Sequence, residues 1–131
     1  MTVTVTSEVL AALLAEARAG GSHEVCGLLY GSENAIAAHC PCANVHPEPH
    51  HRFEIDPAAL VGAHRAMREG GPRLIGYYHS HPAGPLEPSA TDEALAAKDG
   101  MLWAIVGERR VTLWRAGDDG LTPLAYRVTG A

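Results

Sequence analysis

The first part of the chain changes from one hydrophobic period to another. Residues 2–6 alternate threonine and valine, which is the period-two pattern of a half-buried strand. From Ser7 to about Ala19 the apolar residues recur every three or four positions, which predicts an amphipathic helix. Ser7 is its expected N-cap, and the glycine pair at 20–21 is its expected end. The apolar face of this helix consists of Val9, Leu10, Leu13, Leu14 and Ala17.

Further strands and helices are expected along the rest of the chain. The apolar run at residues 25–30 is too uniform for an exposed strand, and Asp56 followed by Pro57 is typical of a helix start. In chain order we expect a hairpin at 25–30 and 35–42, a loop at 44–52, a short strand at 53–55, a helix at 57–69, a strand from 74, a helix from 89 to about 98, and strands at 101–106, 110–116 and 124–128. This order predicts an α/β (α+β) fold in which two to three helices flank a mixed sheet.

Composition and charge indicate one globular domain over residues 1–131. Nearly half of the residues, 47%, are apolar, and this length suffices for one hydrophobic core but not for two. The net charge of -5 gives no general attraction to nucleic acid or to anionic membranes. No apolar run approaches the ~20 residues of a membrane span, and the first residues do not resemble a signal peptide. We therefore expect a cytoplasmic protein, and three cysteines, which do not make a disulfide framework, suit a reducing compartment.

Two histidines and an aspartate have the spacing of a metal site. His79 and His81 lie two apart at the end of an apolar strand, so their side chains point to one face and Ser80 to the other. Catalytic zinc usually has three protein ligands, and His and Asp are common among them. Asp92 can be the third, because it lies in the first turn of a helix that Ser89 caps. The pattern therefore predicts a site for one zinc ion.

The same serine and aspartate also match a capping box, Ser89-x-x-Asp92, in which both side chains bond the backbone of the helix start. A carboxylate that binds a metal cannot fully serve the backbone as well. We therefore expect Asp92 to serve the metal rather than the cap.

Peptide hydrolysis also needs a group that carries a proton from water to the leaving amine. No acid inside the metal pattern is free for this, and Glu24, before the apolar strand at 25–30, is the upstream candidate. At this point the chain resembles the JAMM (MPN+, M67-type) zinc metallopeptidases, in particular their small stand-alone prokaryotic members. The residues that match the family signature are Glu24, Gly27, His79, His81, Ser89 and Asp92. The resemblance extends over residues 24–31, 53–57 and 76–82.

The resemblance implies a fold, a chemistry and a substrate. The fold would be MPN/cytidine-deaminase-like, with a curved mixed sheet or partial barrel. The ligands of one zinc per chain would be His79, His81 and Asp92, Glu24 would be the general acid/base, and Ser89 would stabilise the oxyanion. A zinc-bound water would attack an amide or isopeptide bond at or after the C-terminal Gly-Gly of a ubiquitin-like or sulfur-carrier protein of the ThiS/MoaD type. By strand alternation Tyr77 shares the face of the zinc histidines and could line the site, whereas Tyr78 faces the other side.

Two other functions fit the same sequence. The family also contains non-catalytic MPN-type modules that bind proteins, although this chain keeps every ligand position. A zinc hydrolase of small or cell-wall peptides would need the same ligands.

Two other groups of residues invite a different chemistry. Cys26 could be a nucleophile with His23 or His79 as its base, but we favour packing as a small apolar residue in the core. The segment 39–51 could hold a second metal through His39, Cys40, Cys42, His46, His50 and His51. Its Cys-x-Cys spacing differs from the Cys-x-x-Cys of structural zinc sites, so we favour a hairpin arm and a loop beside the active-site groove.

Overall fold

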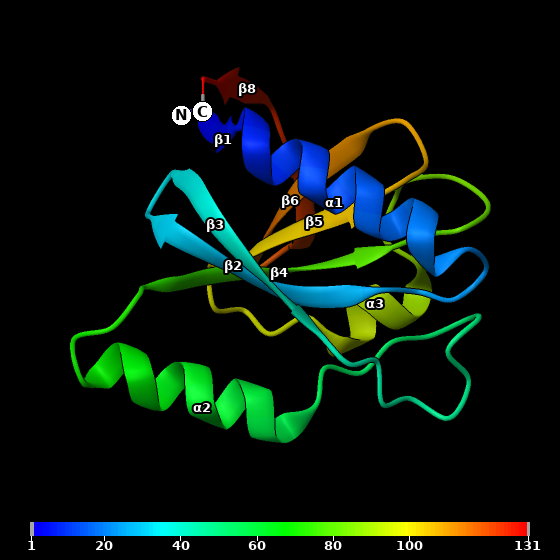
Figure 1. The fold of residues 1–131 in the computed structure, drawn as a ribbon, viewed down its shortest axis with the longest axis horizontal. Coiled ribbons are helices and arrows are strands. Elements are labelled where there is room, and N and C mark those ends of the chain that lie inside the picture. The colour runs from blue at the N-terminus through cyan, green and yellow to red at the C-terminus, as the bar shows by residue number, and fades with distance from the viewer. Residues whose placement is uncertain (1, 131) are drawn as a thin grey trace.

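A computed structural model describes residues 2–130 as one curled, eight-stranded mixed sheet with three helices (Figure 1). The strands are β1 (Val3–Thr6), β2 (Cys26–Ser32), β3 (Ala35–Cys42), β4 (Leu74–Ser80), β5 (Leu102–Val106), β6 (Val111–Gly117), β7 (Gly120–Leu124) and β8 (Tyr126–Thr129). The helices are α1 (Ser7–Gly20), α2 (Pro57–Arg68) and α3 (Ala90–Leu95). The predicted α+β class, with helices against a curved mixed sheet, is confirmed.

The strand order is β7-β6-β5-β4-β2-β3-β1-β8. Neighbours are antiparallel except where β4 meets β5 and where β1 meets β3 and β8. The two strands at the centre of this order are β4 and β2. The site described below lies where β4 ends and β2 begins.

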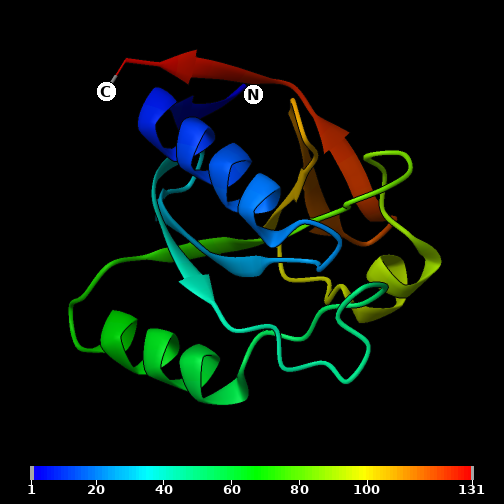
Figure 2. The same ribbon diagram turned by 45° about the vertical axis from the view of Figure 1, so that its right-hand side comes forward.

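Helices cover the two faces of the sheet separately, as Figure 2 shows, with α1 on one side and α2 on the other. Alternate residues of β5 divide between the two layers, because strand side chains point to opposite faces. Leu102, Ala104 and Val106 pack with α1, whereas Trp103 packs with α2. No helix within residues 2–130 is long and apolar enough to span a membrane.

Three element boundaries differ from the prediction. Thr6, not Ser7, is the N-cap of α1, since its hydroxyl accepts a hydrogen bond from the Val9 N–H at 3.2 Å. Residues 53–55 form no strand but only a single bridge between Ile55 and Asn44. Helix α3 ends at Leu95 rather than near residue 98, because the chain turns into an extended conformation at residue 96 to return to β5.

The C-terminal segment also differs from the single strand expected at 124–128. Residues 120–124 are β7, which forms a hairpin with β6, and residues 126–129 are β8, which pairs with β1 instead. The break falls at residue 125, where the chain leaves one end of the sheet and joins the other. This exchange of partners is a tertiary effect that local hydrophobicity does not encode.

Candidate metal centre

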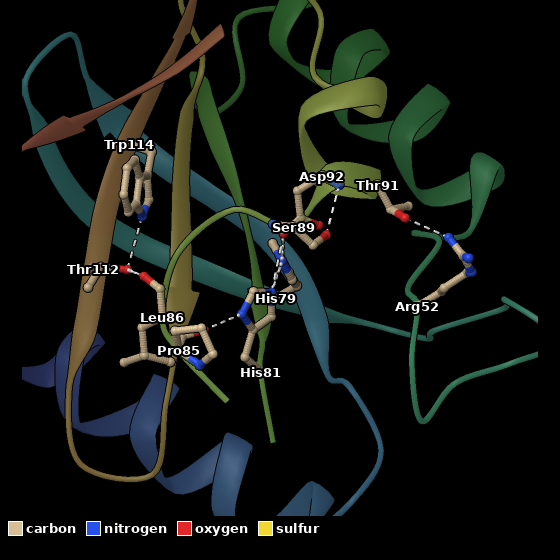
Figure 3. A network of polar contacts seen from close by, with 10 residues as sticks. All are labelled: Arg52, His79, His81, Pro85, Leu86, Ser89, Thr91, Asp92, Thr112 and Trp114. Carbon is tan, nitrogen blue, oxygen red and sulfur yellow. Dashed lines mark hydrogen bonds and ion pairs between the residues drawn. The ribbon is translucent and has the colours of Figure 1, made fainter. Parts of the chain in front are cut away.

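The structure brings the three predicted ligands together at the C-terminal end of β4 (Figure 3). His79 is the next-to-last residue of β4, and His81 comes directly after the end of the strand. Asp92 projects from the first turn of α3. The Nε2 atoms of His79 and His81 are 3.1 Å apart, and each lies 3.2 Å from Oδ2 of Asp92. One nitrogen from each ring and one carboxylate oxygen therefore meet at a single point.

The spacing and protonation of these atoms fit a zinc ion. Tetrahedral zinc with bonds of about 2.0–2.1 Å places its ligand atoms roughly 3.3 Å apart. The Nδ1 atom of His81 lies 3.0 Å from the Pro85 carbonyl oxygen, which can only accept, so Nδ1 carries the proton. Its Nε2 atom, which faces Oδ2 of Asp92, is then the ring nitrogen that loses a proton to bind a cation. The same hydrogen bond orients the ring for ligation.

Aromatic side chains fix the ring of His79. The ring is fully buried, stacks on Phe53 with centroids 4.2 Å apart and planes inclined by 14°, and meets Trp103 edge-on at 5.8 Å. Its Nδ1 atom has no hydrogen-bond partner within residues 2–130. Burial lowers the pKa of His79, which favours the neutral form that binds metals.

The Asp92 carboxylate serves both the helix cap and the cluster, which corrects the expectation that one would exclude the other. Its Oδ2 accepts a hydrogen bond from the Ser89 N–H at 2.9 Å, and the Ser89 hydroxyl accepts one from the Asp92 N–H at 3.0 Å. Both uses are compatible because a carboxylate oxygen has two lone pairs. Burial alone would raise the pKa of Asp92, but its bonds to His79 and His81 hold the pKa well below its usual range.

Glu24 faces the same cluster from the segment before β2. Four backbone contacts hold this segment. The Glu24 N–H donates to the Pro49 carbonyl at 2.7 Å, and the Glu24 carbonyl accepts from the Asn44 side-chain amide at 2.9 Å. The next residue, Val25, is bonded to Ser80 on both sides, by its N–H to the serine Oγ and by its carbonyl to the serine N–H, each at 2.9 Å. Ser80, between the two histidines, thus joins their strand to the segment of the acid.

The environment of Glu24 suits proton transfer near neutral pH. Glu24 is 9% exposed, and burial is the largest effect that raises its pKa, to about 7. The Asp92 carboxylate also raises the pKa of Glu24, whereas His81 and Arg52 lower it. An acid with a pKa near the working pH can both accept and release a proton.

Two neighbouring grooves lie in this part of the surface and share Arg52, Phe53, Thr91 and Leu95. The first, here called the metal-site groove, has a volume of about 880 Å³ and is lined by Glu24, His81, Ser89 and Asp92, with the segments 50–53 and 82–88 as walls. The second, here called the side groove, has a volume of about 670 Å³ and lies over Trp103 next to α2. Tyr77 shares a sheet face with His79, as predicted, but it lines the side groove and not the metal-site groove. Tyr78 lies on the opposite face, where its hydroxyl donates to the Glu16 carboxylate at 2.9 Å.

The other candidate residues lie in different surroundings. Cys26 is fully buried in the α2-side core, and burial raises the pKa of its thiol to about 12, as suits a packing role. In segment 39–51, His39 lies 4.0 Å from Glu16 and His50 packs edge-on against His23. Within residues 2–130, the only group of three or more metal-ligating side chains close enough to hold an ion is that of His79, His81 and Asp92.

The sequence prediction missed the supporting roles of Ser80 and Asn44. A serine within an apolar strand is expected to be hydrogen-bonded if buried, and Ser80 is 1% exposed, so burial of the strand was the available signal. Asn44 gave no such signal, because three of its four partners lie 8 to 20 positions away in the sequence. Its Nδ2 donates to the carbonyls of Glu24 and Arg52 at 2.9 and 3.0 Å, and its Oδ1 accepts from the N–H groups of His46 and Glu54 at 3.1 and 3.0 Å.

The chain is similar to several known proteins. The family model of prokaryotic homologues of the JAB domain matches residues 6–117. A desampylase from Haloferax volcanii is 39% identical over 100 residues, which cover 71% of each chain. A CysO-cysteine peptidase from Mycobacterium tuberculosis is 28% identical over 109 residues, or 82% of this chain and 74% of the relative. A solution structure of a Desulfitobacterium hafniense protein superimposes with a TM-score of 0.84 at 27% identity, covering 99% of this chain and 94% of the other.

Proposed function

This chain belongs to the prokaryotic JAB family of JAMM (MPN+) metallopeptidases, and we propose on that premise that it is a zinc-dependent peptidase acting on ubiquitin-like or sulfur-carrier proteins. The bond cleaved would be an amide at or after the C-terminal Gly-Gly of such a protein. The observation that carries the proposal is the meeting of three ligand atoms at one point, with the Glu24 carboxyl lining the same groove.

The substrate class is supported by the relatives and by the shape of the site. Two relatives are named a desampylase and a CysO-cysteine peptidase. The residues that line the metal-site groove include four small or rigid ones, Gly21, Pro82, Ala83 and Pro85. Such walls leave room for an extended chain without side chains, which is the form of a Gly-Gly tail.

The residues of the site divide the chemistry between them. His79, His81 and Asp92 would hold zinc, which when bound supplies Lewis-acid polarisation of the scissile carbonyl and activation of water. Glu24 accepts a proton from the attacking water and delivers it to the leaving amine nitrogen. The Ser89 hydroxyl accepts from the Asp92 N–H, so its own proton remains available for the oxyanion of the tetrahedral intermediate.

The proposal is tested by zinc analysis together with a cleavage assay. We expect about one zinc per chain, and we expect zinc-loaded protein to trim a Gly-Gly-extended sulfur carrier from its own genome, with the products weighed by mass spectrometry. Glu24→Gln should keep the zinc and the melting temperature but lower kcat by ~10²–10⁴, the usual scale of general acid/base catalysis. An uncut carrier, or a Glu24→Gln variant with unchanged turnover, would overturn the proposal, and a stable protein without zinc would favour a binding module.

A further inference from the structure

Arg52 is the only lysine or arginine among the described residues that line the metal-site groove. The acidic side chains of Glu24, Glu87 and Asp92 line the same groove. Apart from a bound zinc ion, Arg52 is therefore the one lysine or arginine position of this groove, among residues 2–130, that would attract a negatively charged substrate group. The surroundings of that position indicate what it can bind.

The backbone of Arg52 is anchored to the site on two sides. Its carbonyl accepts a hydrogen bond from the Asn44 amide at 3.0 Å, and the same amide holds the carbonyl of Glu24. The following residue, Phe53, stacks on the ring of His79. The Cα of Arg52 is thus held in a constant position relative to a metal ligand and to the catalytic acid.

The guanidinium of Arg52, in contrast, uses only part of its hydrogen-bonding capacity within residues 2–130. Its Nη1 donates to the Thr91 hydroxyl at 2.6 Å (Figure 3). Both residues line the metal-site groove as well as the side groove. The Nε atom of Arg52 lies 3.9 Å from a carboxylate oxygen of Glu48, an exposed pair of little strength. Within residues 2–130, Nη2 has no hydrogen-bond partner. A guanidinium has five N–H donors, so this one retains the capacity for a further ligand.

The ligand that suits a guanidinium best is a carboxylate, which it binds through two parallel charge-assisted hydrogen bonds. Arg52 and Thr91 line the same groove as Asp92, so the bound group would lie in the groove that holds the proposed reacting bond. We propose that Arg52 binds the free α-carboxylate of the residue that is released, so that the enzyme favours carriers extended by one amino acid over isopeptide conjugates. This inference rests on the proposed function and specifies its leaving group.

The reaction balances with water as the only co-substrate. The oxygen of water forms a bond to the carbonyl carbon of the terminal glycine, the C–N bond breaks, and the leaving nitrogen takes a proton. The products are a carrier ending in Gly-Gly and a free amino acid. Arg52 keeps its charge throughout, since it acts on the carboxylate of the leaving group and not on the reacting atoms.

The test uses two substrates that differ by one charge. A sulfur carrier from the same genome is extended after Gly-Gly by one alanine, with its terminus either a free carboxylate or a carboxamide. Zinc-loaded wild-type protein should cleave the carboxylate form with a kcat/KM roughly 10- to 100-fold higher, mainly through a lower KM, as expected for hydrogen bonds to a charged group. Arg52→Gln should bring this ratio close to one, and Arg52→Lys should give an intermediate ratio because it keeps the charge but loses the paired geometry.

The matched control is Arg68→Gln, which removes the same charge from the exposed end of α2, outside both grooves. It should keep the wild-type ratio. A wild-type ratio near one, or an undiminished ratio in Arg52→Gln, would overturn the inference while cleavage of both substrates upholds the proposed function. Cleavage of neither substrate by the zinc-loaded wild-type protein would overturn the proposed function itself.

Discussion

Replacement of Asn44 by alanine should weaken both the fold and the catalytic step. The side chain makes four hydrogen bonds, of which those to Glu24 and His46 are partly buried and those to Arg52 and Glu54 are exposed. A hydrogen bond contributes about 0.5–1.5 kcal/mol net, more where the freed partner is buried, so the two partly buried bonds dominate. We expect the free energy of unfolding in urea to fall by about 2–3 kcal/mol. For a chain of this size that corresponds to a loss of roughly 6–15 °C in melting temperature.

The same replacement should lower kcat, because Glu24 loses a contact that holds its backbone against the metal ligands. We expect a fall of at least about tenfold, as small displacements of a catalytic group are costly. In a Glu24→Gln background, adding Asn44→Ala should have little further effect on kcat, since the acid that Asn44 positions is already absent. If kcat stays at the wild-type value while stability falls, Asn44 does not position the acid. If stability is unchanged, the four hydrogen bonds do not carry the energy assigned to them.

Three further outcomes follow from the site. Ser89→Ala should cost about 0.5–2 kcal/mol of stability through the lost cap and should also lower kcat, and a loss of stability alone would remove the serine from oxyanion stabilisation. As the pH falls through about 7, kcat/KM should decrease, because Glu24, whose pKa burial raises to about 7, becomes protonated and can no longer accept a proton; a flat profile from roughly pH 5.5 to 8 would contradict this. Removing zinc with a chelator should lower the melting temperature, because bound zinc adds about 2.7 kcal/mol to the free energy of unfolding when free zinc is at a hundred times its Kd. In His79→Ala the melting temperature should no longer depend on free zinc.

The cluster of His79, His81 and Asp92 could be predicted because local rules place all three residues. The period of a strand puts His79 and His81 on one face, and a serine N-cap puts Asp92 in the first helical turn. The position of Glu24 did not follow from such rules, since 55 residues separate it from His79 and the resemblance to a family supplied the link. In the structure the link is the backbone pairing of Val25 with Ser80.

The parts that could not be predicted depend on contacts between distant segments. The bonds of Asn44 join the start of β2 to a loop, and residues 53–55 remain irregular where this asparagine takes the N–H of Glu54. The strand expected at 124–128 is divided because residues up to 124 pair with β6, whereas residues from 126 pair with β1. In both cases the sequence pattern indicated which residues are polar and which are apolar, but it did not indicate which segment each would pair with.

The pairing of β2 with β4 should protect the site of this enzyme against local unfolding at the edges of the sheet. The acid and the histidines are tied to adjacent central strands, whereas β7 and β8 form the two margins of the sheet. Fraying at either margin would leave the reactive groups in register, and amide hydrogens near residues 26–29 and 76–79 should be among the slowest to exchange. Heat inactivation should therefore coincide with cooperative melting of the whole domain instead of preceding it.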